Sequence, residues 1–325
     1  MRAKYGALAN DPVADEAAND FLLSGGSAVG AVAAGFFAAS GAAAGVLLGP
    51  LSALVVGLGA GARAFDGRLR QPGLGVRRLR AAKASEPVPD AARVAVPTAV
   101  QALVVALGYD GGQKLGTVLR AGIARAQRAG APARAEALQR VRELGGGAIA
   151  SSHFVRPFLR VAGPSQGGLL TPQDFAAIPE IDSQAETVGD AIEVPWAAAA
   201  DEPAGDAGPG VGCAVIAVDV RGVFAAVAYR RVVDGFFLDE LDLEAPLVQL
   251  GPEGTAKAKR QARGAARPSP GDRLPAAAPV AVRCDAEGRA VAVVATPSAR
   301  RAGAGSPTLT LRRDPSTGAV ESARG

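Results

Sequence analysis

The sequence predicts an α+β sandwich, and three observations carry that prediction. Apolar residues recur at helical spacing in the first half of the chain, for example at Val100, Leu103 and Leu107. Short β-branched runs occur in pairs in the second half, from Cys213 onward. Helices and strands come in separate blocks, which favours an α+β arrangement over a series of βαβ units.

The opening of the chain contains a long apolar run. Residues 21–62 carry no charged side chain over 42 positions, and a membrane-spanning helix needs only about 20 apolar residues. Alanine and glycine dominate this run, however, and both contribute little insertion energy. Acidic residues precede it, where a signal peptide would carry positive charge. We therefore expect a short amphipathic helix over 12–24, a buried helix of small residues over 28–44 and a core strand over 52–59.

The next elements are mainly helical. Residues 63–95 read as a strand end followed by a long exposed loop rich in Pro, Gly and Arg. Periodic apolar residues predict helices over 96–107 and 115–129. A charged, Ala-rich stretch that ends at three glycines predicts a helix over 131–144, and we expect a fourth over 151–161. Thr171 suits a helix N-cap, Pro172 the first helical position and Asp174 the third, which predicts a new helix start.

We interpret the whole chain, residues 1–325, as a single domain with four zones. The helix-rich part covers 1–178 and an acidic linker or surface loop covers 179–210, with a short strand allowed over 187–196. A part rich in β-hairpins covers 211–298, built from runs 213–219 with 223–229 and 280–284 with 290–295. The tail, 299–325, is weakly specified and contains one candidate strand over 308–311.

Composition excludes several classes of site. A single histidine rules out a multi-histidine metal centre, and two cysteines cannot form a disulfide framework. We expect neither a metal nor a cofactor. The net charge of +4 comes from 35 basic and 31 acidic side chains, and the basic runs at 77–83 and 257–267 lie in Pro-, Gly- and Ala-rich stretches. Those runs predict solvated loops and no nucleic-acid partner.

Six segments, taken in order, resemble motifs of the gamma-glutamyltranspeptidase family. They are residues 11–29, 63–68, 94–103, 167–175, 214–222 and 270–279. The resemblance spans roughly residues 10–298 and identifies the chain as a shortened, degenerate member of that family. It implies an N-terminal-nucleophile hydrolase fold, which is a four-layer αββα sandwich.

In that family, autoprocessing cuts the chain before a threonine, whose hydroxyl is the nucleophile and whose new amine is the base. When the family motif is aligned on Asp219, the threonine position falls on Gly212, which has no side chain. Cys213 falls one residue later. A shift by one residue would make Cys213 the nucleophile but would turn the following side chains to the opposite faces of the strand. The resemblance therefore leads us to expect no catalytic nucleophile and a buried strand cysteine.

Other positions that the resemblance assigns to the site are also altered. Ala276, Ala277 and Ala278 stand where the family has a serine pair that binds substrate. Pro297 and Ser298 stand where it has glycines that form an oxyanion hole. Arg68 matches the arginine that holds the substrate carboxylate, although a role in anchoring a loop fits it equally well. His153 lies outside the nucleophile motif.

These observations lead us to expect a catalytically inactive protein that serves as an accessory or structural subunit, with a protein partner or a homodimer as its assembly. One alternative is a divergent amidohydrolase or gamma-glutamyl transferase whose nucleophile is Cys213 or Thr187. A second alternative is a membrane-associated subunit that uses residues 21–62. Because no signal peptide is evident, we expect a cytoplasmic location.

Overall fold

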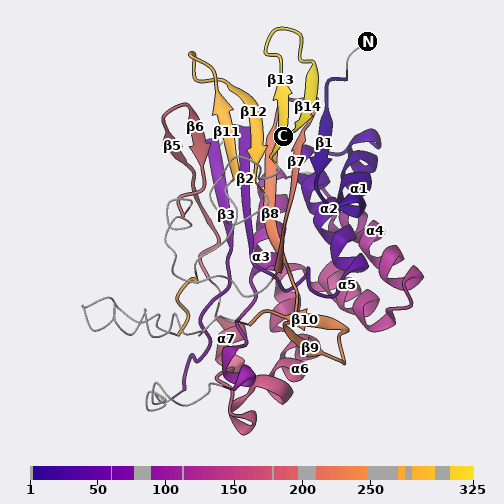
Figure 1. The fold of residues 1–325 in the computed structure, drawn as a ribbon, viewed down its shortest axis with the longest axis vertical. Coiled ribbons are helices and arrows are strands. Elements are labelled where there is room, and N and C mark those ends of the chain that lie inside the picture. Colours follow the sequence, from indigo (N-terminus) through magenta and orange to yellow (C-terminus); the bar gives the residue numbers. More distant parts are fainter. Residues whose placement is uncertain are drawn as a thin grey trace, which may run out of the picture.

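The computed structural model describes residues 3–59, 61–76, 89–111, 113–177, 179–196, 210–247, 270–274, 280–296 and 308–325. Two six-stranded antiparallel sheets face each other, and helices cover the far side of the first (Figure 1). The first sheet has the strand order β1 (Gly6–Ala9), β7 (Gly210–Val218), β8 (Phe224–Val232), β2 (Leu51–Leu58), β3 (Gly61–Gly67), β4 (Asp182–Gln184). The second has the order β14 (Val320–Arg324), β13 (Leu309–Arg313), β12 (Ala290–Ala295), β11 (Val280–Cys284), β6 (Ala191–Glu193), β5 (Glu186–Val188).

The helices lie beside the first sheet and below it. They are α1 (Pro12–Leu23), α2 (Ala28–Ala42), α3 (Ala99–Asp110), α4 (Leu115–Arg128), α5 (Pro132–Leu144), α6 (Ser152–Ala162) and α7 (Pro172–Ala176), with short 3-10 turns at Asp90–Arg93, Gly145–Ala150 and Pro164–Gln166. Helices α6 and α7 occupy the lower end of the molecule, next to the small hairpin of β9 (Phe236–Leu238) and β10 (Leu243–Ala245) (Figure 1). The helices predicted from the sequence are present, with ends shifted by up to three residues.

Helix α2 explains the apolar run. Its N-cap Ser27 accepts a hydrogen bond from the Gly30 amide, and almost every one of its residues is buried. Glycines let other backbones approach closely: a Cβ on Gly41 would lie 2.0 Å from the carbonyl oxygen of Gly122 on α4. Continuous apolarity here therefore reflects burial between the first sheet and helices α1 and α4. Within the described ranges, no helix combines the length and the apolar character needed to cross a membrane.

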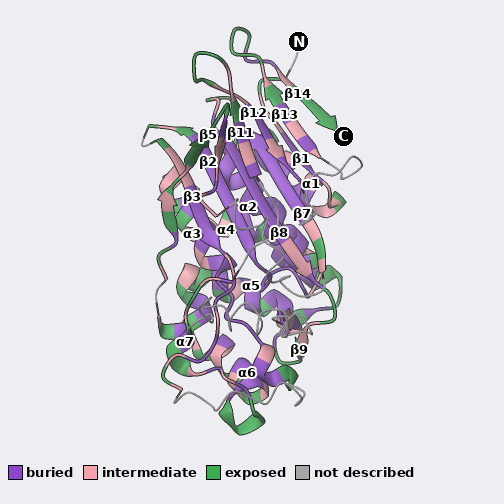
Figure 2. Ribbon diagram, turned by 60° about the vertical axis from the view of Figure 1, so that its left-hand side comes forward, coloured by how far each residue is buried: buried purple, intermediate pink, exposed green. Residues whose placement is uncertain are grey.

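The first sheet separates two cores. Along β7, Cys213, Val215 and Ala217 pack into the core shared with the helices. The alternate residues Ala214 and Ile216, together with Val218, pack into the core between the two sheets. This alternation is the period of two of a strand that is buried on both sides. Figure 2 shows both layers of buried residues at the centre of the molecule.

Two of the expected zone assignments need correction. The stretch 179–210, expected to be a linker or loop, supplies β4 to the first sheet and β5 and β6 to the second, so it joins the sheets. The tail is better specified than its sequence indicated, because β13 and β14 form a hairpin at the edge of the second sheet. Leu309 and Leu311 of β13 are buried in the core between the sheets, which gives the tail its structural role.

The expected α+β sandwich is confirmed. The described residues form a helical layer, the first sheet and the second sheet, and within them no helix follows α7. The outer helical layer of a four-layer αββα sandwich is therefore not among the elements described.

Candidate functional site

The position expected to hold the nucleophile lies near the start of β7. Gly212 is paired with Arg230 of β8, and its carbonyl oxygen accepts a hydrogen bond of 3.0 Å from Asn10 Nδ2. Asn10 Oδ1 in turn accepts a hydrogen bond of 2.8 Å from the Ala214 amide. One asparagine side chain thus fixes the backbone on both sides of Cys213. Gly212 contributes no side chain to this place.

Cys213 faces the helices, not the other sheet. It lies opposite Tyr229 in the β7–β8 register, and only 3% of it is exposed. Its Sγ is 3.7 Å from the carbonyl oxygen of Val211, to which it donates a weak hydrogen bond. Burial, with a further contribution from the Asp11 carboxylate, raises the pKa of the Cys213 thiol to about 11. The thiol is therefore protonated at neutral pH, and the thiolate that would be nucleophilic is disfavoured.

Thr187 lies elsewhere. It is an exposed residue of β5, the edge strand of the second sheet, and it pairs with Ile192 of β6. The remaining cysteine, Cys284, is on β11 of the second sheet, and both cysteines are free thiols. The two candidate nucleophiles, Cys213 and Thr187, therefore lie in different sheets.

Arg68 follows β3 and is the centre of a polar cluster. Its guanidinium donates a bidentate pair of hydrogen bonds to Asp66, with Nε 2.9 Å from Oδ1 and Nη2 2.7 Å from Oδ2. The same guanidinium stacks on the only tryptophan, Trp196, at 4.9 Å from the ring centroid. Trp196 Nε1 donates to Ser52 Oγ at 2.9 Å. Asp66 occupies the bidentate edge that a substrate carboxylate would otherwise use.

A second arginine shares Asp66. Arg273 Nε lies 3.2 Å from Asp66 Oδ2, and Arg273 Nη1 donates to the Arg68 carbonyl oxygen and to Thr98 Oγ1. Burial lowers the pKa of Arg273, and the Asp66 carboxylate opposes that shift. With one carboxylate between two guanidinium groups, this part of the cluster carries one excess positive charge. It can hold an anion electrostatically, but it contains no pair of nucleophile and base.

Gly212 and Asp66 lie on the same side of the first sheet. The cross-strand register places Ala214, Ala228, Ser52 and Asp66 in one row, and Gly212 is two residues from Ala214 on the same face. Asp66 is three strands away from β7, or about 14 Å at the usual strand spacing. Sequence reasoning identified Arg68 but not the partners Asp66 and Trp196. The spacing Asp66-Gly67-Arg68 was a usable signal, because residues i and i+2 share a strand face.

Several expected positions lie outside the described residues. They are Ala276, Ala277, Ala278, Pro297 and Ser298, and the basic runs at 77–83 and 257–267. His153 is described on α6, where its Nδ1 lies 3.9 Å from Glu136 Oε1 of α5. Within the part of the chain that the structure describes, no group of three or more His, Cys, Asp or Glu side chains could hold a metal ion.

This chain is similar to known proteins in its three-dimensional structure but has no match among family models or curated sequences. The solved structure of LmbA2991T421A aligns with a TM-score of 0.72 and 14% identity, covering 100% of this chain and 97% of that one. The cephalosporin acylase from Bacillus halodurans aligns with a TM-score of 0.70 and 12% identity, over 99% of this chain and 96% of that one.

The gamma-glutamyltranspeptidase of Helicobacter pylori aligns over 56% of this chain and 66% of that one, with a TM-score of 0.44 and 20% identity. The shared architecture therefore rests on the two fuller matches. Together with the two facing sheets and the helical layer, they show that this chain shares the fold of those two solved structures, an α+β sandwich.

Proposed function

We propose that this chain is a non-catalytic protein with the N-terminal-nucleophile hydrolase fold and that it acts as an accessory or structural subunit of a complex. The observation that carries the proposal is the start of β7. Gly212 stands at the nucleophile position, and the neighbouring thiol of Cys213 is buried on the opposite face of the strand. Hydroxyl and thiol nucleophiles need an adjacent base or a lowered pKa, and neither supports Cys213, whose pKa is raised.

The surroundings of Arg68 support the same proposal. In an active site, this arginine would offer its two parallel N–H groups to the substrate. Here those groups bind Asp66 of the same chain, and only 16% of the Arg68 side chain is exposed. We infer that the cluster of Arg68, Asp66 and Arg273 stabilises the junction between β3 and residues 270–274. The arginine that resembles the family's substrate ligand then has a structural role.

The proposal predicts an uncut chain. Intact-mass analysis of purified protein, fresh and after prolonged incubation, should show one species at 32.4 kDa, because no nucleophile is placed to attack the preceding peptide bond. The incubated sample controls for slow autoprocessing. Two fragments produced by a cut before Cys213 or Thr187 would contradict the proposal. So would release of the chromophore from a gamma-glutamyl anilide that is lost in a Cys213→Ala variant.

A further inference from the structure

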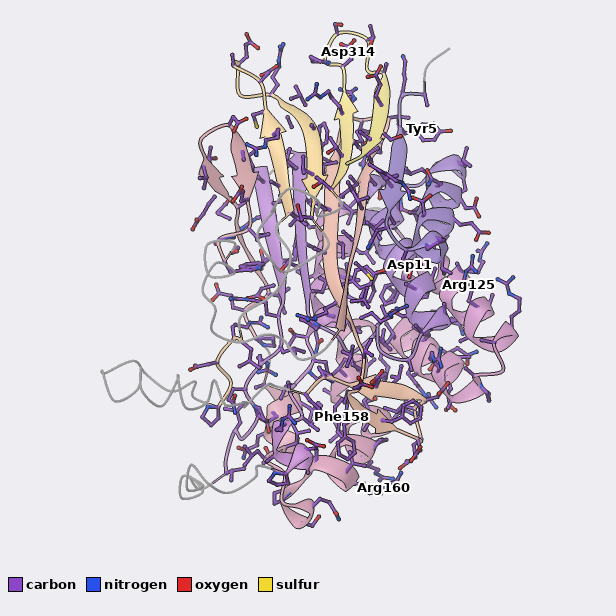
Figure 3. The ribbon with its side chains drawn as sticks, in the orientation of Figure 1. Tyr5, Asp11, Arg125, Phe158, Arg160 and Asp314 are labelled. Atoms are coloured by element: carbon purple, nitrogen blue, oxygen red, sulfur yellow. The ribbon has the colours of Figure 1, made fainter. Side chains whose placement is uncertain are left out.

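A cavity of about 620 Å³ lies at the end of the second sheet, where β13 turns into β14. Its walls include Cys284, Arg312 and Asp314, and its floor includes Ala292 and Val294. Figure 3 shows Asp314 at the opposite end of the molecule from Phe158 and Arg160 of α6. A Cβ on Gly222 would lie 3.1 Å from the Arg313 guanidinium, so this end is also next to the β7–β8 turn.

The cavity is separate from the Gly212 face. Gly212 and the turn at Gly222 mark opposite ends of β7. Seven residue-to-residue steps separate Gly212 from Asp219, which corresponds to about 23 Å in an extended strand. A ligand in the cavity would not reach the Arg68 cluster unless it extended along the whole sheet.

The strand register places two arginines on either side of an alanine. Arg283 of β11 pairs with Ala292 of β12, and Ala292 pairs with Arg312 of β13. The two arginines are therefore two strands apart, about 10 Å between their Cα atoms, and project from the same face. Ala292 is too small to fill the space between them. Asp190 binds only Nη1 of Arg283, so other guanidinium N–H groups of this arginine, together with those of Arg312, can contact an anion placed over Ala292.

The hydrogen-bond donors in this cavity outnumber the free acceptors. Among the described residues, the side chain of Arg312 has no hydrogen-bond or ion-pair partner, and Nε of the neighbouring Arg313 is buried without a partner. The carboxylates, in contrast, are engaged. Asp190 binds Arg283 Nη1 at 2.5 Å, and Asp314 accepts hydrogen bonds from Ser316 and Thr317.

Glu321 pairs with Arg312 in the strand register, and it also takes part in an interaction of its own. The groups left to bind a ligand are thus mainly guanidinium N–H groups. A guanidinium presents its donors in a planar fork that matches carboxylate and phosphate oxygens. The apolar floor formed by Ala292 and Val294 leaves room for a small organic body.

We propose that this cavity binds a small molecule that carries two or more oxyanion groups, either carboxylates or phosphates, which Arg283 and Arg312 hold across Ala292. This inference does not depend on whether the Gly212 face is catalytic. The presence of a free thiol in the cavity wall provides a local reporter, because Cys284 is partly exposed whereas Cys213 is buried.

The test uses the full-length protein with citrate and pyrophosphate as probes of the two sources, and acetate and spermidine as comparisons. Isothermal titration measures affinity, and the rate at which a thiol reagent modifies Cys284 reports occupancy of the cavity. We expect citrate, pyrophosphate or both to bind and to slow Cys284 modification. Acetate, with one charge, should bind at least about tenfold more weakly, because one charged contact is worth about 1.5 kcal/mol or more.

Two variants make the test specific. Arg312→Gln should weaken binding of the oxyanion roughly tenfold or more, while the matched change Arg120→Gln, at an exposed arginine of α4, should not. Ala292→Glu places a carboxylate between the two arginines and should abolish binding. Circular dichroism checks that each variant is folded. If Ala292→Glu does not fold, the affinity of the surface variant Arg312→Gln still tests the proposal.

The proposal fails if neither oxyanion binds or protects Cys284, if Arg312→Gln binds as tightly as the unaltered protein, or if spermidine is the better ligand. Any of these results would leave the proposed lack of catalysis untouched. Chain cleavage, by contrast, would overturn the proposed function and leave the cavity proposal standing.

Discussion

At the scale of single residues, the chemistry available to β7 depends on the side of the strand that each side chain faces. Gly212 and Cys213 are adjacent in a strand, so they face opposite sides of the sheet, and Cys213 packs into the core shared with the helices. Asn10 binds the backbone of Gly212 and of Ala214, which holds the register that turns the thiol toward the helices. The position of Cys213 in the sequence thus matters less than the face on which this register places it.

Thiol accessibility provides a prediction at this scale. A thiol reagent should modify one cysteine of the native protein, Cys284, and both cysteines in denaturant, because Cys213 is buried and its pKa is raised to about 11. Mass spectrometry of the labelled peptides distinguishes the two sites. Rapid labelling of Cys213 in the native protein would show that this thiol is accessible and would again make it a candidate nucleophile.

The same pKa shift predicts how stability depends on pH. The folded pKa of Cys213, about 11, exceeds the ordinary value of 9.0, so the folded state keeps this proton at a pH where the unfolded state has lost it. The contribution of this thiol to stability is therefore complete below the ordinary value and declines as pH rises toward the folded value. Between pH 9.0 and about pH 11, urea unfolding should show that the free energy of unfolding falls less in Cys213→Ala than in the unaltered protein. An identical pH dependence in both proteins would argue against the shift.

At the scale of elements, the crossing of α2 and α4 depends on glycine. A Cβ on Gly122 would lie 2.2 Å from the carbonyl oxygen of Phe37, and one on Gly41 would lie 2.0 Å from the carbonyl oxygen of Gly122. Real Cβ atoms do not approach backbone so closely, so a side chain at either position would push the helices apart. The glycines that interrupt the apolar run are therefore a packing requirement of a helix buried on all sides.

Gly122→Ala should consequently destabilise the fold by about 1–3 kcal/mol or more, as overpacking of a close-packed core does. Gly108 of α3 is the matched control, since a Cβ there would meet no atom within 4 Å. Gly108→Ala should stabilise the protein by about 0.5–1 kcal/mol through helix propensity alone. Denaturant unfolding of the two variants measures both effects, and equal effects of the same sign would contradict the proposed close crossing.

At the scale of the whole molecule, the second sheet is assembled from distant parts of the sequence. Residues 186–193 supply β5 and β6, residues 280–295 supply β11 and β12, and residues 309–324 supply β13 and β14. The inward side chains of these strands pack on the first sheet; Val293 and Leu311, for example, share a core with Ile216. The final strands are thus part of the domain core.

Leu311→Ala should therefore cost about 2–5 kcal/mol of unfolding free energy, the range for removing a buried leucine side chain. Ser322→Ala, on the exposed part of β14, should change it by less than about 0.5 kcal/mol. Thermal and urea unfolding of both variants provide the measurement. A Leu311→Ala variant as stable as Ser322→Ala would mean that the tail does not contribute to the core.

Local periodicity and chain punctuation were enough to predict a buried helix over 28–44, which the structure has at Ala28–Ala42, the capping box at Thr171 and Asp174, and both long hairpins. Short strands were harder to predict. β1, β4 and β14 have three to five residues each and carry no strong apolar pattern, so only pairing with a neighbour makes them strands. Gly212 and Arg68 were found from the sequence, and Asp66 lies only two residues from Arg68, whereas the contacts of Arg68 with Arg273 and Trp196 join segments more than 100 residues apart.

The α+β class, the burial of the long apolar run and the absence of a side chain at position 212 can all be derived from the amino-acid sequence. Those properties follow from periodicity, composition and residue identity, which are local. Three further properties follow from the folded structure: Cys213 faces the helices, Arg273 and Trp196 contact the Asp66–Arg68 pair, and two arginines flank Ala292. These depend on strand register and on which strands become neighbours, and both are set by the packing of the whole chain.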